Sequence, residues 1–220
     1  MQFIYLKYVH FAFRIINLQF YNHPNRMVKD EEAQIITDFL NGDKDAYVLM
    51  YKTYVKELYN YGKAFTSDTE MVKDAIQDIF CKILCKRSLL SNIHNLKCFL
   101  FISLKNRLID MNRKVLTFNE NEYPITNFTV TNITILDDLI EEENRQEISQ
   151  KIKSLLEQLT DHQREAVCLR YIYDMEYKDI AQILKMENEK SARNLVSRAI
   201  QKLKSENVYI LFLFSLIKLN

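Results

Sequence analysis

Apolar side chains recur every three or four positions along most of this 220-residue chain, which is the spacing of amphipathic helices. A helix C-terminal signal, Asn41-Gly42-Asp43, ends the first such stretch, and Ser67 or Asp68 can cap the start of the third. The pattern predicts helices over residues 30–40, 46–65, 67–86, 96–114, 160–172, 175–184 and 190–203. With two Gly and two Pro the chain also lacks the turn residues of a β-rich fold, so the expected fold class is all-α.

Helical periodicity lapses between Thr117 and Thr134, a stretch rich in Asn and Thr that is followed by acidic residues. This composition is typical of a linker. We predict two small helical domains over 29–114 and 148–206, joined by an acidic linker over 115–147. Two ends flank them: an N-terminal extension over 1–28, for which Met27 is the expected native start, and an apolar tail over 207–220 that is too short to span a bilayer.

The charged residues alternate in blocks, although the net charge is only +1. Residues 82–114 include eight basic residues and one acid, whereas residues 115–149 include eight acids and one basic residue. Residues 190–204 have five basic residues and no acid. Two basic blocks around an acidic one are the pattern of a bipartite polyanion binder with a separate connector. A solvated helix face explains either basic block alone, but explains both less easily.

The four cysteines lie singly within apolar helical patterns. Cys81 and Cys85 are four residues apart and share a helix face, but no His or further Cys stands beside them at a zinc-finger spacing. We expect the thiols to pack in the core, with no metal, no other cofactor and no disulfide framework, as in the reducing cytoplasm.

Residues 159–203 have the pattern of a helix-turn-helix. A short helix carries Ala181 on its inner face, where two crossing helices need a small residue, and a break over 185–189 leads to a longer helix with a basic and polar outer surface. Arg and Asn can pair with base edges in the major groove, and Ser and Lys suit phosphate. We predict DNA contacts from Lys190, Ser191, Arg193, Asn194, Ser197 and Arg198; a merely solvated basic helix is the alternative.

This region resembles the extracytoplasmic-function group of bacterial RNA polymerase σ factors, especially the form common in Bacteroidetes. LTDHQREAVCLRYIYDMEYKDIAQIL is similar to the start of the group's C-terminal domain, and SARNLVSRAIQKLK to its promoter-reading helix. In the N-terminal half, DAIQDIFCKILCKR resembles the helix that docks on the polymerase, and NLKCFLFISLKNRLIDMNRK the helix that opens the −10 element. The resemblance spans about Lys29 to Glu206. Only the turn over 185–190 departs from it, being one residue longer and bringing Glu187 and Glu189 near the phosphates.

The resemblance implies an alternative σ factor with a σ2-like and a σ4-like domain, working in the cytoplasm with core RNA polymerase, promoter DNA and an anti-σ factor. It implies that the polymerase is met by Asp74, Gln77, Asp78 and Phe80. It assigns the −10 element to Lys97, Lys105, Asn106 and Arg113, with a pocket for an extruded base beside the 88–96 loop. The acidic linker would follow the polymerase channel that nucleic acid normally occupies.

Two other classes of function were weighed against this one. A stand-alone helix-turn-helix regulator would dimerise on a palindrome and bind duplex DNA without polymerase. An enzyme is not expected, because the sequence has no Gly-rich phosphate loop, no metal-ligand cluster and no credible Ser/His/Asp set. Asp161-His162 stands at a predicted helix start, where capping explains it.

Overall fold

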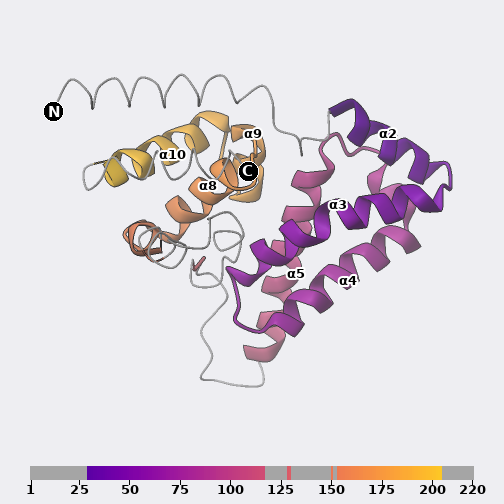
Figure 1. The fold of residues 1–220 in the computed structure, drawn as a ribbon, viewed down its shortest axis with the longest axis horizontal. Coiled ribbons are helices and arrows are strands. Elements are labelled where there is room, and N and C mark those ends of the chain that lie inside the picture. The colour runs from indigo at the N-terminus through magenta and orange to yellow at the C-terminus, as the bar shows by residue number, and fades with distance from the viewer. Residues whose placement is uncertain (1–28, 117–127, 130–149, 151–152, 205–220) are drawn as a thin grey trace, which may run out of the picture.

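A computed structural model describes residues 29–116, 128–129, 150 and 153–204 of the chain (Figure 1). Its elements are α2 (Lys29–Leu40), α3 (Lys44–Lys63), α4 (Thr69–Cys85), the 3₁₀ turn η1 (Arg87–Leu90), α5 (Leu96–Leu116), α8 (Asp161–Tyr171), α9 (Tyr177–Ile183) and α10 (Glu189–Lys204). The all-α prediction is confirmed. The predicted extension 1–28, the tail 207–220 and most of the linker 115–147 lie outside the described residues, and no described helix is long and apolar enough to cross a membrane.

Short polar residues set the boundaries of the helices. Gly42 follows α2 with a φ of +102°, a backbone conformation that glycine adopts without strain, and Asp43 then caps α3 by accepting the Asp45 amide at 2.8 Å. Of the two predicted caps for α4, Asp68 is the one used, because its carboxylate accepts the amides of Glu70 and Met71, both at 3.0 Å. A reciprocal capping box between Thr160 and Gln163 opens α8.

The first four helices pack into one unit, which we call the N-terminal unit (α2–α5 with η1). Helix α3 contacts α2, α4 and α5, and α4 also lies against α5 (Figure 1). The approach of α3 to α4 is close at Gly62, where an added Cβ would stand 2.6 Å from Val72 Cγ1. The core of the unit is made of fully buried aliphatic and aromatic side chains that include Met50, Leu58 and Leu100.

The last three helices form the C-terminal unit (α8–α10), in which α10 packs on both α8 and α9. Ala181 is 5% exposed, as expected of the small residue at a helix crossing. The turn between α9 and α10 places Lys185 at a φ of +52° and returns the Met186 amide to the Ala181 carbonyl at 2.8 Å. A non-glycine residue in the left-handed region thus closes a turn that has no Gly.

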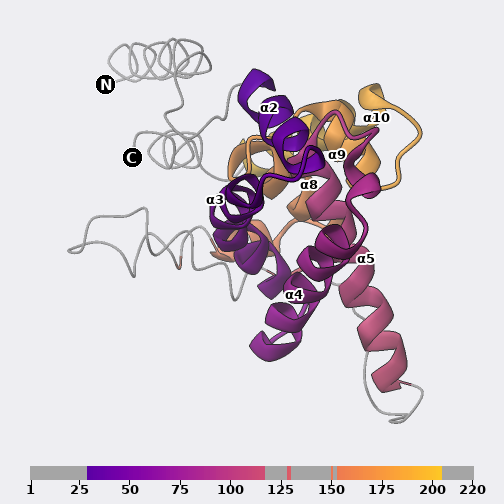
Figure 2. The ribbon, with the colours of Figure 1, turned by 90° about the vertical axis from the view of Figure 1, so that its right-hand side faces the viewer.

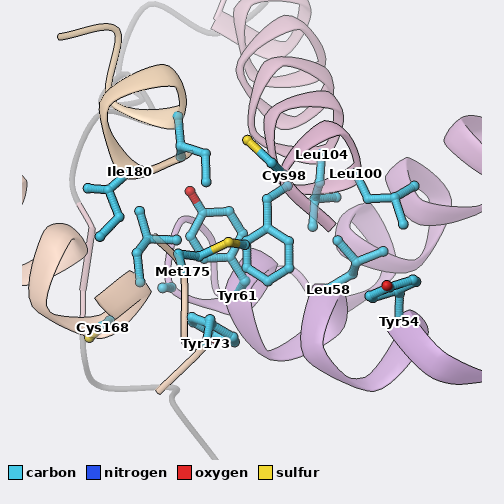
Figure 3. Packing of buried hydrophobic residues seen from close by; sticks show 14 of the residues in the cluster. Tyr54, Leu58, Tyr61, Cys98, Leu100, Leu104, Cys168, Tyr173, Met175 and Ile180 are labelled. Carbon is cyan, nitrogen blue, oxygen red and sulfur yellow. The ribbon is translucent and has the colours of Figure 1, made fainter. Parts of the chain in front are cut away.

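The two units share one continuous core, which the sequence did not lead us to expect. Helix α5 packs against α9, and an aromatic cluster crosses the boundary (Figures 2 and 3). Within it Tyr173 of the C-terminal unit meets Tyr61 of α3 at 5.7 Å and Phe101 of α5 at 5.0 Å between ring centroids. The aromatic cluster consists of Tyr61, Phe65, Phe101, Phe128 and Tyr173.

Candidate nucleic-acid interface

Helix α10 turns its predicted DNA-contacting residues outward. Its inner face is fixed by Ala192, Val196, Ala199 and Leu203, all at most 1% exposed. Because these positions recur every three or four residues, the intervening polar residues are held on the outside. The exposed set contains Lys190, Arg193, Asn194, Ser197 and Arg198, and Ser191 is half-buried.

The start of α10 is held by Asn188, which sequence reasoning did not single out. Its side-chain oxygen accepts the Ser191 amide at 2.9 Å and the Ser191 hydroxyl at 3.2 Å, as a helix cap does. Ser191 therefore helps to build the first turn, and its hydroxyl is already occupied in this structure. The DNA contact predicted for Ser191 stays a prediction, because a hydroxyl that donates one hydrogen bond can still accept another.

Arg193 is positioned by two neighbours. Its guanidinium donates to Glu189 at 2.7 Å and lies 5.2 Å from the ring centroid of Tyr177, which the Arg170 guanidinium also approaches at 5.1 Å. These contacts are compatible with a cation–π interaction that steers an exposed arginine. Beside it lies an open hollow of about 580 Å³, lined by Tyr171, Tyr177, Arg193, Val196, Ser197, Ile200 and Gln201.

The residues predicted for the −10 element all lie on α5, but they are not equally accessible. Arg113 is exposed, and Asn106 is half-buried. Lys97 forms an ion pair with Glu57 at 2.8 Å, and Lys105 forms one with Glu165 at 2.7 Å. Two of the four side chains predicted to contact the −10 element are therefore paired with carboxylates of the same chain. The predicted base pocket beside α5 stays a prediction.

The predicted polymerase-facing residues of α4 divide in the same way. Asp74 and Gln77 are exposed, while Asp78 accepts a hydrogen bond from Arg107 Nε at 2.8 Å. Phe80 is only 2% exposed, and its ring packs edge-on against Tyr51 at 5.0 Å. A polymerase-facing role for Phe80 must be corrected, because it belongs to the buried stripe of α4 with Val72, Ile76 and Ile83. The large apolar side chains that are exposed in the described residues are instead Leu84 of α4 and Val48, Leu49 and Tyr51 of α3.

The cysteines also differ from expectation. Cys98 and Cys168 are buried, as predicted, and burial raises the pKa of each thiol to about 12. The prediction of core packing is wrong for Cys81 and Cys85, which are exposed on α4. The buried stripe of α4 runs through Val72, Ile76, Ile79 and Ile83, and the helical period places Cys81 and Cys85 on the other side of the helix.

Two buried charged residues of α8 were missed by sequence reasoning. The Arg164 guanidinium donates to the carbonyls of Leu156 at 2.8 Å and Leu159 at 2.9 Å and also to that of Phe128. Glu165 is 4% exposed and accepts the Tyr61 hydroxyl at 2.6 Å; burial, reinforced by this carboxylate, raises the Tyr61 pKa. Neither role has a signal in the sequence, since both side chains read as ordinary polar positions of an amphipathic helix.

Comparisons with known proteins agree with this geometry. Residues 149–203 match the family described as Sigma-70, region 4. The chain is similar to the ECF RNA polymerase sigma factor SigM of Bacillus subtilis, 26% identical over 170 residues, which are 71% of this chain and 91% of that protein. A similar solved structure is the sigma factor RpoE of Bartonella quintana, crystallised with the anti-sigma factor NepR, at 21% identity and a TM-score of 0.52 over 74% of this chain and 96% of that one. That likeness bears on the fold.

Proposed function

We infer that the chain, an RNA polymerase σ factor of the extracytoplasmic-function type, binds core RNA polymerase and directs it to specific promoters. The observation that carries this proposal is a σ region 4 helix-turn-helix whose last helix turns Arg193, Asn194 and Arg198 into solvent. A basic helix alone supports only DNA binding. The N-terminal unit adds a second basic helix, α5, and the exposed polar groups of Asp74 and Gln77 on α4, as a promoter reader that docks on a polymerase requires.

We assign the −35 element to α10. Arg193 and Asn194 stand in the N-terminal half of the helix, the part that usually meets base edges, and their side chains can make paired hydrogen bonds to guanine and adenine. Lys190, Ser197 and Arg198 flank them and suit phosphate contacts, with Ser191 contributing through its position in the capped first turn. Glu187 and Glu189 precede these residues, and their negative charge near the phosphates either weakens DNA binding or narrows the choice of sequence.

We assign polymerase docking to the exposed face of α4. Asp74, Gln77 and Asp78 supply carboxylate and amide groups that can pair with basic groups of a partner. The exposed apolar side chains of Tyr51 and Leu84 provide the anchors that the buried Phe80 cannot provide in this conformation.

We assign the −10 element to α5, whose Lys97, Lys105, Asn106 and Arg113 would hold the strand electrostatically, with Asn106 best suited to touch a base. In the same proposal the units 29–114 and 148–206 act as σ2-like and σ4-like domains, and the acidic connector lies in the nucleic-acid channel of the polymerase. The chain would act in the cytoplasm, held in check by an anti-σ factor. Kinship with the Bacteroidetes members of the group belongs to this proposal as well.

A gel-shift experiment separates this function from that of a stand-alone regulator. Labelled genomic duplex fragments are incubated with the chain alone, with core polymerase alone, and with both. The proposal expects a fragment-specific shift only with both proteins, and Arg193→Ala should abolish the fragment selection while the chain still binds the polymerase. A specific shift by the chain alone would favour the regulator.

A further inference from the structure

One buried ion pair joins the two units beside their shared apolar core. The carboxylate of Glu165, on α8, takes the Lys105 ammonium of α5 with both oxygens, at 2.7 and 2.8 Å, and also accepts the Tyr61 hydroxyl of α3 at 2.6 Å. Glu165 has a side chain 5% exposed and Lys105 one 17% exposed, so water competes little for either charge. Charge-assisted hydrogen bonds in such a setting are stronger than those between neutral groups.

Further contacts join the N-terminal and C-terminal units, along a boundary that we call the seam. Cys98, near the start of α5, is 2% exposed, with its sulfur 3.5 Å from Gln182 Oε1 on α9. The carbonyl of the connector residue Phe128 accepts a hydrogen bond from the Arg164 guanidinium of the C-terminal unit. The amide of the next residue, Thr129, donates to the Ala64 carbonyl, at the end of α3 in the N-terminal unit, at 2.7 Å. The two units are thus held together at the ion pair, at Cys98 and through two residues of the connector.

One group opposes the contact. The Tyr173 hydroxyl is buried in the aromatic cluster and has no hydrogen-bond partner in the described part of the chain, although its ring contacts Tyr61 and Phe101. A hydroxyl that loses its water without replacement destabilises the closed arrangement. Figure 3 shows Tyr173 between the helices of the two units, near Tyr61 and Met175. The closed arrangement of the seam therefore carries the cost of one buried hydroxyl that lacks a partner in the described residues.

We propose that Glu165 takes the place of a promoter phosphate on Lys105, so that the chain off the polymerase closes its own −10 helix against its C-terminal unit. This rests on the proposed function, in which Lys105 meets the −10 strand. A carboxylate and a phosphate offer the same kind of anionic oxygens to an ammonium group, and Glu165 already takes two of the three donors of a Lys105 side chain that is only 17% exposed. Lys105 becomes available to the −10 strand only when the units separate, and binding to core polymerase selects the separated state.

The thiol of Cys98 reports on this opening directly. In the closed chain it is shielded by α9, and separation of the units exposes it. We would measure its alkylation by iodoacetamide, mapped to the Cys98 peptide by mass spectrometry, for the full chain with and without core polymerase. Glu165→Gln removes the charge but keeps an acceptor for Tyr61. Glu70→Gln is the matched control, because Glu70 also pairs with a lysine, Lys73, at 2.7 Å, but on the exposed first turn of α4.

The proposal expects shifts of opposite sign. Glu165→Gln should raise the Cys98 alkylation rate by about tenfold or more, as the loss of a buried charge-assisted hydrogen bond implies, and Tyr173→Phe should lower it by roughly tenfold. Glu70→Gln should leave it unchanged, and core polymerase should raise it for the unaltered chain. A far-UV circular dichroism melt identifies a variant that has unfolded; if Glu165→Gln does so, Tyr173→Phe decides alone.

Two results would overturn the inference: equal rates for Glu165→Gln and Glu70→Gln in folded protein, or a Tyr173→Phe rate no lower than that of the unaltered chain. An unchanged Cys98 rate in a demonstrated complex with core polymerase would also overturn it. A failure of the proposed function would give a different result from these. There the chain binds no polymerase, while the comparison of variants in the free chain still decides whether Glu165 holds the units together.

Discussion

Replacing Gly62 by alanine sets two effects of opposite sign against each other. Within a helix, alanine is favoured over glycine by about 1 kcal/mol. Here, however, the added Cβ would lie 2.6 Å from Cγ1 and 3.4 Å from Cγ2 of Val72, and 3.5 Å from Leu104 Cδ2. Carbon atoms pack best at roughly 3.5–4.0 Å, and Val72 is fully buried and stiff at χ1, so α3 and α4 must move apart.

Overpacking of this kind costs about 1–3 kcal/mol, and a contact this short belongs in the upper half of that range. We therefore expect Gly62→Ala to lower the free energy of unfolding by about 1–2 kcal/mol and the melting temperature by roughly 2–8 °C. Val72→Ala alone should also be destabilising, because it leaves a cavity in the core. In the double variant the methyl group that Gly62→Ala introduces fills the space that the Val72 methyls leave, so the two changes should partly compensate. Urea denaturation of the four proteins would give a coupling energy of about 1–3 kcal/mol. A more stable Gly62→Ala, or additive single effects, would refute the packing argument.

Three further outcomes are expected. Asn188→Ala should fray the first turn of α10, at a cost of about 1 kcal/mol and with faster amide exchange there, whereas Asn188→Ser should keep the cap. Arg198→Ala should weaken promoter binding evenly across sequences and reduce the slope of log affinity against log salt by about 1; a sequence-dependent loss would contradict a phosphate contact. Burial raises the Cys168 pKa from 9.0 to about 12, so its contribution to stability, complete below pH 9, should fall by about 1.4 kcal/mol per unit as the pH rises toward 12. Cys168→Ala should flatten that slope in alkaline urea titrations.

Local features of the fold could be predicted from the sequence because their causes are local. Apolar periodicity located the α-helices α2–α5 and α8–α10 to within a few residues, and the caps at Asp68 and Thr160 were visible as short polar residues before apolar runs. The outer face of α10 followed from the same periodicity. Ala181 could be placed at a helix crossing because a small residue is required there.

The contact between the two units could not be predicted, because its partners are far apart in sequence. Lys105 and Glu165 are separated by 60 residues, and each occupies a position that in an isolated helix would face water. The sequence analysis therefore predicted that Lys105 contacts DNA and could not predict its ion pair with Glu165. Phe80 was misplaced for a different reason: its role came from the resemblance of the whole segment, whereas the spacing from Val72 and Ile76 already puts it on the buried face.

The shared core also bears on how the proposed function is regulated. A chain whose units were independent would present both basic helices at all times, and would bind nucleic acid non-specifically through them. Here one of the two is partly closed by Glu165 and by Glu57, while α10 stays exposed. If α5 meets the −10 strand as proposed, release of Lys105 from Glu165 is the step that a partner would have to bring about.

Transcription in vitro tests the central claim most directly. Core RNA polymerase would be incubated with fragmented genomic DNA, with and without the chain, and the 5′ ends of the transcripts mapped. We expect start sites that depend on the chain and share two upstream elements at a fixed spacing, with Arg193→Ala and Asn194→Ala each changing the preference at the more distant one. Transcripts that are the same with and without the chain, while the chain is shown to be folded, would contradict the account.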